Sequence, residues 1–203
     1  MSKAPSIDIR DPDLFDKYPP GEYSYGSNGY GKYACGTLQI SDDPKRDPKA
    51  QAAAGGEARR GKDSKYGIDD GGHLIAAYFG GAPGEENLTA QDRNLNRSTY
   101  KAMEHNWAEH VKNGDKVFVY VETDRADRPT AYMGYVVYED ANGRRDVDYF
   151  HMINESQAEI ASWEEAAAEA ERNDPTLAEL YSETEAGISD ALDSGSDRSA
   201  GME

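Results

Sequence analysis

One block of the sequence gathers polar side chains that are suited to activating water beside a cation. His73 follows two glycines, Asn96 lies 23 residues further on, and Glu104 lies eight residues after Asn96. A neutral histidine can accept a proton at pH 7, and an amide oxygen is a hard ligand of the kind that Mg²⁺ prefers. Such a pair would make water nucleophilic and neutralise charge on the group that the water attacks. These three residues are therefore the candidate chemical centre.

The spacing of Asn96 and Glu104 limits how they could share a cation. Eight residues on a helix separate two side chains by about 80° around the axis and about 12 Å along it. The two residues can lie on one side of a helix, but they cannot both bind one ion directly. Because helical side chains lean toward the N-terminus, Glu104 is suited to a contact through the water shell of the ion.

Each of these residues also has a structural interpretation. A single histidine after Gly-Gly is more often structural, and Asn96 taken alone is more often a helix cap than a ligand. Asp69 and Asp70 could be metal carboxylates, although turn and capping roles are the simpler interpretation. The functional interpretation is favoured because the polar residues occur together and in order, as Asn87, Gln91, Asn96 and Glu104.

The block extends beyond these positions. It comprises Asp69-Asp70-Gly71-Gly72-His73-Leu74-Ile75, Asn87-Leu88-Thr89-Ala90-Gln91, Asn94-Leu95-Asn96-Arg97, Tyr100 and Glu104. Upstream it continues through Gly36-Thr37-Leu38 and Ala54-Gly55-Gly56, and downstream through Phe79-Gly80-Gly81 to Trp107. The whole resembles the DNA/RNA non-specific endonuclease family, in the branch that occurs as toxin domains of bacterial secretion-system and polymorphic-toxin proteins. The resemblance covers roughly residues 23–121, about half the chain.

The resemblance implies a role for each polar position. His73 matches the general base of the family, and Asn96 matches the asparagine that binds the metal ion. Glu104 matches a helix glutamate that contacts the water shell of the metal. Asn87 and Gln91 match polar residues that support the site, and we expect Asn87 among the catalytic residues and Gln91 among those that bind substrate.

The chain departs from the family pattern at one position. Many relatives have an arginine that contacts the scissile phosphate where this chain has Gly71, although Asp-Gly-Gly-His also occurs in the toxin branch. We expect Arg93 or Arg97 to supply the missing charge and therefore to bind substrate.

The resemblance also implies an activity, a cofactor and partners. The activity is hydrolysis of DNA and RNA with Mg²⁺ or Mn²⁺, which leaves 5′-phosphate ends. The role is that of an antibacterial toxin, secreted or delivered into a target cell and acting in its cytoplasm, with an immunity protein as its inhibitor.

Two other classes of function remain open. The first is a catalytically silent relative that binds nucleic acid or protein, which the absent arginine at Gly71 and the net charge of −17 suggest. The second is an adaptor whose acidic tail binds a basic partner, which would show no dependence on metal.

The charge is distributed unevenly along the 203 residues. From His151 onward there are 14 acidic and 2 basic residues, which leaves a net charge of −5 for residues 1–150. Residues 45–65 are basic, with seven lysines and arginines against three carboxylates. A local basic stretch matters more to a phosphate ligand than the total, because salt screens charges beyond about 8 Å.

Several classes of segment are not expected. No stretch approaches the roughly 18 apolar residues of a membrane span, so we expect no membrane partner. Residues 1–10 lack the apolar segment of a Sec signal peptide. Cys35 is the single cysteine, so no internal disulfide is expected.

Periodicity predicts an α+β fold, in which an antiparallel sheet carries a ββα-metal unit. Alternating residues predict strands near 23–25, 32–40, 117–122, 131–138 and 147–152, and a type I′ turn at Asn142-Gly143. An apolar run predicts a further strand at 73–79, and Tyr100, Met103, Trp107 and Val111 form the apolar face of a helix over about 96–113. Residues 41–65 are expected to be a loop. The predicted organisation is a polar lead-in over 1–20, the nuclease domain over 21–153 and an acidic C-terminal segment over 154–203, helical to about 172 and disordered from about 174.

Overall fold

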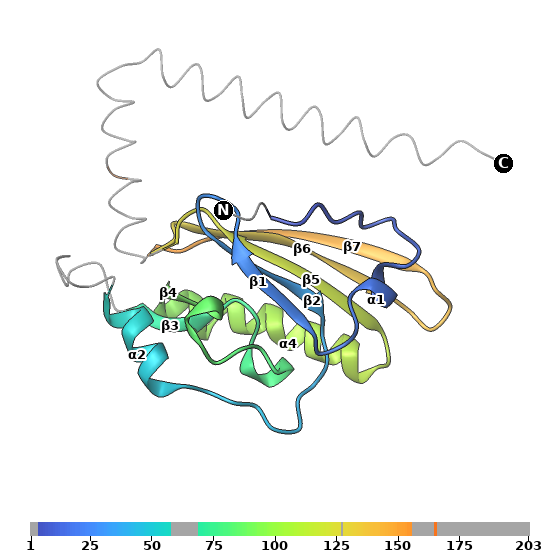
Figure 1. The fold of residues 1–203 in the computed structure, drawn as a ribbon, viewed down its shortest axis with the longest axis horizontal. Coiled ribbons are helices and arrows are strands. Elements are labelled where there is room, and N and C mark those ends of the chain that lie inside the picture. The colour runs from blue at the N-terminus through green and yellow to red at the C-terminus, as the bar shows by residue number, and fades with distance from the viewer. Residues whose placement is uncertain (1–3, 58–68, 127, 156–164, 166–203) are drawn as a thin grey trace, which may run out of the picture. The chain divides into compact units, whose positions relative to one another are not determined.

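The structure, a computed structural model, describes residues 4–57, 69–126, 128–155 and 165 (Figure 1). The chain divides into two units, residues 1–156 and 157–203, and the description that follows concerns the first. The helix and the disordered tail expected beyond residue 155 lie outside the described residues, apart from Glu165. In the part of the chain that is described, no helix is both long enough and apolar enough to cross a bilayer.

A five-stranded antiparallel sheet forms the centre of this unit, with strand order β1-β2-β5-β6-β7. The strands predicted from alternation are confirmed. Their bounds are Tyr23–Ser27 (β1), Lys32–Thr37 (β2), Lys116–Thr123 (β5), Ala131–Glu139 (β6) and Arg145–Ile153 (β7). β7 alternates in burial along its length, whereas β2 and β5 are buried on both faces because a core lies on each side of the sheet.

The type I′ turn predicted between β6 and β7 is wrong. Glu139 pairs with Arg145, so five residues connect the strands, and Gly143 alone among the described residues of this loop has a positive φ, of 77°. A type I′ turn needs positive φ at both central residues. The Asp140 carboxylate instead accepts hydrogen bonds from the backbone N–H groups of Asn142 and Arg144, both at 2.9 Å, which stabilises the longer loop.

A second, two-stranded antiparallel sheet and two helices form a ββα unit. Its elements are Asp69–His73 (β3), Leu88–Asp92 (β4), Arg93–Arg97 (α3) and Thr99–Lys112 (α4). The strand predicted over 73–79 is therefore wrong in position: β3 ends where it was expected to begin, and Ala77–Phe79 form a 3₁₀ helix, η2. The helix predicted over 96–113 is divided at Ser98, whose φ of −119° and ψ of −89° are not helical.

The predicted loop over 41–65 contains a helix, α2, over Pro48–Glu57. Asp47 caps it, because its carboxylate accepts hydrogen bonds from the backbone N–H groups of Lys49 (2.8 Å) and Ala50 (3.1 Å). Proline at the first helical position after a capping aspartate is a recognised start signal. The helix was missed because it has almost no apolar face, and small residues allow it to pack closely on β3.

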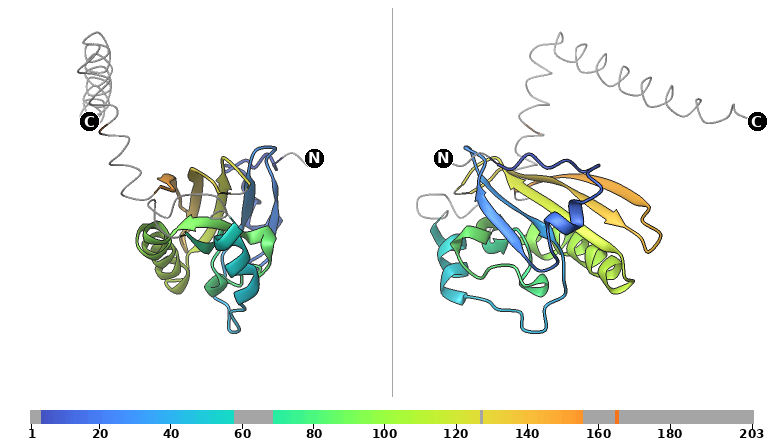
Figure 2. Two further views of the ribbon diagram at one scale, coloured as in Figure 1. Left: turned by 90° about the vertical axis from the view of Figure 1, so that its left-hand side faces the viewer. Right: turned by 45° about the vertical axis from the view of Figure 1, so that its right-hand side comes forward.

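Two hydrophobic cores lie on opposite faces of the large sheet. One face packs against α4 through Tyr100 and Trp107, each 1% exposed, and Figure 2 shows α2 and α4 on this side. The apolar face predicted for the helix is confirmed in these two residues, while Met103 and Val111 are partly buried against the same core. The other face is covered by the predicted lead-in, whose short helix α1 (Leu14–Lys17) buries Leu14 and Phe15.

Candidate functional site

A groove of about 1070 Å³ lies where α2, β3, η2, α3 and α4 meet. Four of the predicted site residues line it, from three different elements: His73 at the end of β3, Asn96 and Arg97 in α3, and Glu104 in α4. The fold thus brings together positions that are 31 residues apart in the sequence. Charged and polar residues make up about half of the lining, among them Arg46, Gln51, Asp69, Asp70, Arg97, Lys101, His105 and Lys112.

His73 presents a neutral imidazole to this groove. It pairs with Leu88 at the end of the two-stranded sheet, and its Nε2 is buried without a hydrogen-bond partner among the described residues. Burial, together with the positive charge of Arg46, lowers the pKa of His73 from 6.5 to about 4. The ring is therefore unprotonated at pH 7 and can act as a base.

Asn87 fixes the backbone that follows His73. Its Oδ1 accepts a hydrogen bond from the Ile75 N–H at 2.9 Å. Its Nδ2 donates to the carbonyl oxygens of Ile75 and Ala82, both at 2.8 Å. Asn87 is fully buried and does not line the groove. The expectation that Asn87 is catalytic does not fit this placement, because every polar atom of its side chain is bonded to backbone.

Gln91 lies on β4 opposite Asp70 and is also fully buried. Its side chain packs on Gly72, where a Cβ atom would lie 2.1 Å from the Gln91 Oε1. It does not line the groove, so the expectation that it binds substrate does not fit either. Gly72 is required because this side chain fills the space above it.

Asn96 makes its hydrogen bond with β3. Its Nδ2 donates to the Asp70 carboxylate at 3.2 Å, and within the described residues its Oδ1 accepts no hydrogen bond. Burial by itself would raise the pKa of Asp70, but the hydrogen bonds from Arg97 and Asn96 outweigh it and lower that pKa. An ionised Asp70 therefore holds the amide nitrogen and leaves the amide oxygen available.

The two arginines expected to replace the family arginine both contact Asp70. Arg97 donates from Nε at 2.8 Å and from Nη2 at 3.1 Å, and Arg93 donates from Nε at 3.4 Å. Arg97 lines the groove, whereas Arg93 does not. The placement of Arg93 thus gives no support to a substrate contact, and Arg97 would have to share its charge with Asp70.

Gly71 has no room for a side chain unless the neighbouring backbone shifts. A Cβ atom there would lie 2.1 Å from the backbone oxygen of Gln51 in α2. The helix therefore occupies the place where relatives have an arginine. The same segment of chain brings another cation to the groove, because Arg46 lies just before α2.

Arg46 and Lys101 are groove cations that the sequence argument did not single out. Arg46 lowers the pKa of both His73 and Glu104. No hydrogen bond or ion pair engages its guanidinium among the residues that the structure describes. The basic stretch over residues 45–65 was the available signal, but it did not identify which of its seven charges reaches the site.

The pKa of Glu104 is raised into the neutral range. Burial raises its pKa from 4.5 to about 7, and the charges of Arg46 and Lys101 oppose this rise. Near pH 7 the carboxyl group is thus divided between its two forms. It can donate a proton to a water molecule or accept a hydrogen bond from one.

The donors in the groove fit a hard divalent cation held largely by water. Within the described ranges, no three or more His, Cys, Asp or Glu side chains are grouped so as to hold a metal ion. Mg²⁺ keeps several of its waters and can be bound by few protein ligands, so the free Asn96 oxygen and the Glu104 carboxyl group are suitable.

Comparison with known proteins gives a consistent assignment. A family model described as DNA/RNA non-specific endonuclease matches residues 18–142. The Type VII secretion system protein EssD of Staphylococcus aureus strain USA300 is 35% identical over 114 residues, which make up 52% of this chain and 17% of that protein. The EssD proteins of strains NCTC 8325 / PS 47 and Newman match with the same identity and coverage. The match therefore concerns a small part of these longer relatives.

Proposed function

Because the chain belongs to the DNA/RNA non-specific endonuclease family, we propose that it is a divalent-metal-dependent nuclease acting on DNA and RNA. His73 is the general base and Asn96 is the direct metal ligand in this proposal. The observation that carries it is the convergence of His73, Asn96 and Glu104 on one groove, with the histidine kept neutral. A neutral base, an amide oxygen and a carboxyl group are the groups that metal-assisted hydrolysis needs.

The proposed reaction assigns a task to each side chain. Neutral His73 takes a proton from a water molecule, and the resulting hydroxide attacks phosphorus in line with the 3′-oxygen, which leaves. The 5′-phosphate stays on the other fragment. Mg²⁺ or Mn²⁺, when bound, supplies positive charge to the phosphate and to the leaving oxygen. Glu104 orients water beside Asn96.

Arg46 is the proposed phosphate contact of this chain. Phosphoryl groups in a transition state are stabilised by arginine and lysine side chains placed beforehand. Arg46 supports this role because it lines the groove and acts electrostatically on both His73 and Glu104. Arg97, which Asp70 holds at 2.8 Å, is a secondary contact.

The biological role that we propose is that of a toxin delivered into another bacterial cell and inhibited by an immunity protein. The support for this role is the similarity to EssD, whose name assigns it to a type VII secretion system. The route of delivery, the inhibitor and the balance between DNA and RNA cleavage belong to the proposal.

Metal dependence is tested by comparing Asn96→Ala with Asn94→Ala, because both residues lie in α3 and Asn94 is exposed. Nicking of supercoiled plasmid is measured while Mg²⁺ is titrated into chelator-treated protein. Asn96→Ala is expected to raise the half-maximal Mg²⁺ concentration at least about tenfold, and Asn94→Ala to leave it unchanged.

Two results would contradict the proposal. Equal Mg²⁺ midpoints for the two variants would place the ligand elsewhere. Plasmid that stays intact with the wild-type protein at every concentration of Mg²⁺ and Mn²⁺ would show that the chain does not cut DNA and would favour the silent relative.

A further inference from the structure

Asp70 connects β3 to α3 through three side chains. It receives hydrogen bonds from Asn96 at 3.2 Å, from Arg97 at 2.8 and 3.1 Å, and from Arg93 at 3.4 Å. Its own side chain is 15% exposed. Charge-assisted hydrogen bonds of this kind are stronger than those between neutral groups, so the carboxylate restricts the orientation of each partner.

The restriction matters most for Asn96, because an amide can face the groove in two ways. Rotation by about 180° about its last side-chain bond exchanges the oxygen and the NH₂ group. An ionised carboxylate only accepts hydrogen bonds, so it binds the NH₂ group and repels the oxygen. In the reverse orientation the amide oxygen would face the Asp70 carboxylate and the NH₂ group would be turned toward the cation.

We propose that Asp70 is a positioning residue for the metal site, which fixes the amide of Asn96 with its oxygen toward the cation. This inference rests on the proposed function, and specifically on Asn96 as the metal ligand. Asp70 does not touch the cation in this arrangement. It acts through Asn96, while its contacts with Arg93 and Arg97 keep the carboxylate ionised and α3 in place.

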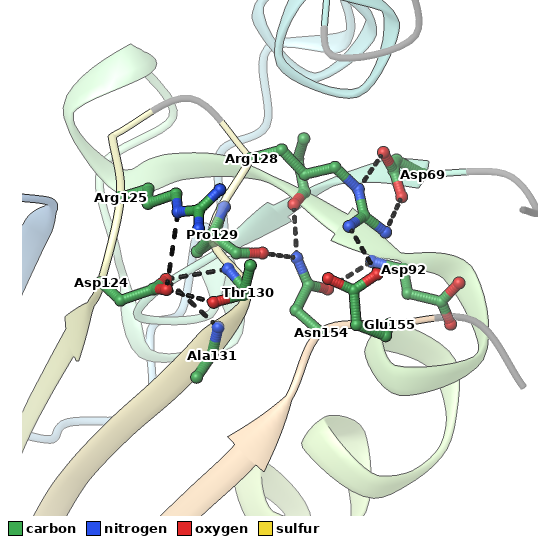
Figure 3. A network of polar contacts seen from close by, with 11 residues as sticks. Asp69, Asp92, Asp124, Arg125, Arg128, Pro129, Thr130, Ala131, Asn154 and Glu155 are labelled. Atoms are coloured by element: carbon green, nitrogen blue, oxygen red, sulfur yellow. Dashed lines mark hydrogen bonds and ion pairs between the residues drawn. The ribbon is translucent and has the colours of Figure 1, made fainter. Parts of the chain in front are cut away.

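The neighbouring residue Asp69 provides a matched comparison. Asp69 also lies on β3 and also pairs with an arginine, because Arg128 donates to it from Nε at 2.9 Å and from Nη2 at 3.1 Å. Arg128 also contacts Glu155 at 3.2 Å, and Figure 3 shows these residues beside Asn154 in a network that joins β3 to the segments around β6 and β7. Asp69 therefore has the same charge as Asp70, lies on the same strand and also lines the groove, but its carboxylate is engaged by Arg128 rather than by Asn96.

The test is Mn²⁺ binding to the full-length chain without nucleic acid, followed by the electron paramagnetic resonance signal of free Mn²⁺. Asp70→Asn is expected to weaken binding about 10- to 100-fold, the usual effect of losing an outer-shell partner of a metal ligand. Asp69→Asn, which removes the same charge from the same strand, is expected to change it less than about twofold. Circular dichroism and thermal melts establish that each variant is folded.

Asp70→Glu separates positioning from simple charge. It keeps the carboxylate but moves it by one methylene, so positioning predicts weaker Mn²⁺ binding, whereas a purely electrostatic role predicts wild-type binding. This variant also keeps the test available if Asp70→Asn does not fold. In the nicking assay, Asp70→Asn should raise the Mg²⁺ midpoint more than it lowers the rate at saturating Mg²⁺, and it should add nothing to Asn96→Ala.

The outcomes separate this inference from the function on which it rests. The positioning role alone would be overturned if both Asp70 variants bound Mn²⁺ with wild-type affinity, or if Asp69→Asn weakened binding equally. It would also be overturned if the effects of Asp70→Asn and Asn96→Ala multiplied in the double variant. A wild-type chain that neither binds Mn²⁺ nor nicks plasmid would overturn both.

Discussion

The same physical effect, burial in the groove, moves its histidine and its carboxyl group toward their neutral forms. His73 loses its proton more easily, with a pKa of about 4, and Glu104 keeps its proton longer, with a pKa of about 7. Arg46 strengthens the first shift and opposes the second. The histidine is therefore unprotonated over the whole neutral range, although the lower pKa also makes it a weaker base. Burial of the glutamate, in turn, costs stability where its carboxyl group is ionised.

That cost predicts how stability depends on pH. The folded-state pKa of Glu104 lies above its ordinary value of 4.5, so its favourable contribution is complete below pH 4.5 and is lost as pH rises through about 7. Between pH 5 and 8 the wild-type chain, without metal, should lose on the order of 2 kcal/mol of unfolding free energy that Glu104→Gln does not lose. Denaturant unfolding of both proteins in chelator at the two pH values measures this difference. Equal losses of unfolding free energy in the two proteins would show that the pKa of Glu104 is not raised.

A second prediction at this scale concerns Arg46. Arg46→Ala should lower kcat/KM for plasmid nicking about 10- to 100-fold, the loss expected for a hydrogen bond to a charged group. Lys45→Ala is the matched control, because Lys45 is the adjacent residue, carries the same charge and lies near Asp43 (3.7 Å) rather than in the groove. Equal effects of the two substitutions would mean that only the general charge of this segment matters.

The resemblance to the nuclease family was sufficient to predict His73, Asn96 and Glu104 as groove residues, and their types suit one chemical task. It was not sufficient for Asn87 and Gln91, since a polar residue inside a motif can equally bond backbone or fill space, and burial decides which. The roles of Asp70 and Arg46 depend on contacts between elements that are distant in the chain, and nothing in the local sequence indicates those contacts.

At the scale of elements, β3 was missed because it contains two glycines, and the helix α2, which is rich in small residues, was expected to be a loop. Gly71 and Gly72 give β3 a low strand propensity, yet each is required because a neighbouring element lies within 2.1 Å of its missing Cβ atom. Alternation predicted the strands of the large sheet correctly, although β2 and β5 are buried on both faces. Of the elements that build the groove, periodicity located α4 by its apolar face, but it did not locate α2, β3 and η2, which lack such a pattern.

The close packing of α2 on β3 is testable with two glycines. Gly71→Ala should lower the unfolding free energy by about 1–3 kcal/mol, because the new methyl group meets the backbone of Gln51 and an element must shift. Gly56→Ala is the control, since it lies in α2 with nothing within 4 Å of its Cβ position, and it should stabilise the chain by up to about 1 kcal/mol. Thermal melts compare the two. A Gly71→Ala protein with the same melting temperature as the wild type would show that α2 does not pack as described.

At the scale of the whole molecule, the net negative charge opposes the binding of a polyanionic substrate. The chain carries −17 overall, whereas the groove lining has four lysines and arginines (Arg46, Arg97, Lys101 and Lys112) against three carboxyl groups (Asp69, Asp70 and Glu104). All the residues of the groove belong to the unit over residues 1–156. Much of the negative charge lies in the sequence that follows this unit, where it would repel a polyanionic substrate over distances that salt can screen.

This separation predicts the effect of removing residues 175–203. The deletion removes seven carboxylates and one arginine and so raises the net charge by six. The shortened chain should stay folded, because the deleted sequence has few large apolar residues, and its substrate association should quicken most at low salt. Nicking rates of both proteins at two salt concentrations, with a thermal melt of each, provide the comparison. Unfolding on truncation, or the same rate ratio at both salt concentrations, would exclude electrostatic repulsion by this segment.

The central claim is that the groove hydrolyses phosphodiester bonds with His73 as its base. Its most direct test is the single-turnover rate of DNA nicking at saturating Mg²⁺ for the wild type, His73→Ala and His151→Ala, the last being an exposed histidine on β7. We predict that His73→Ala is slower by about 10²–10⁴-fold, the usual contribution of general-base catalysis, with its thermal melt still cooperative, and that His151→Ala cuts at the wild-type rate. A His73→Ala protein that cuts DNA as fast as the wild type would contradict the account.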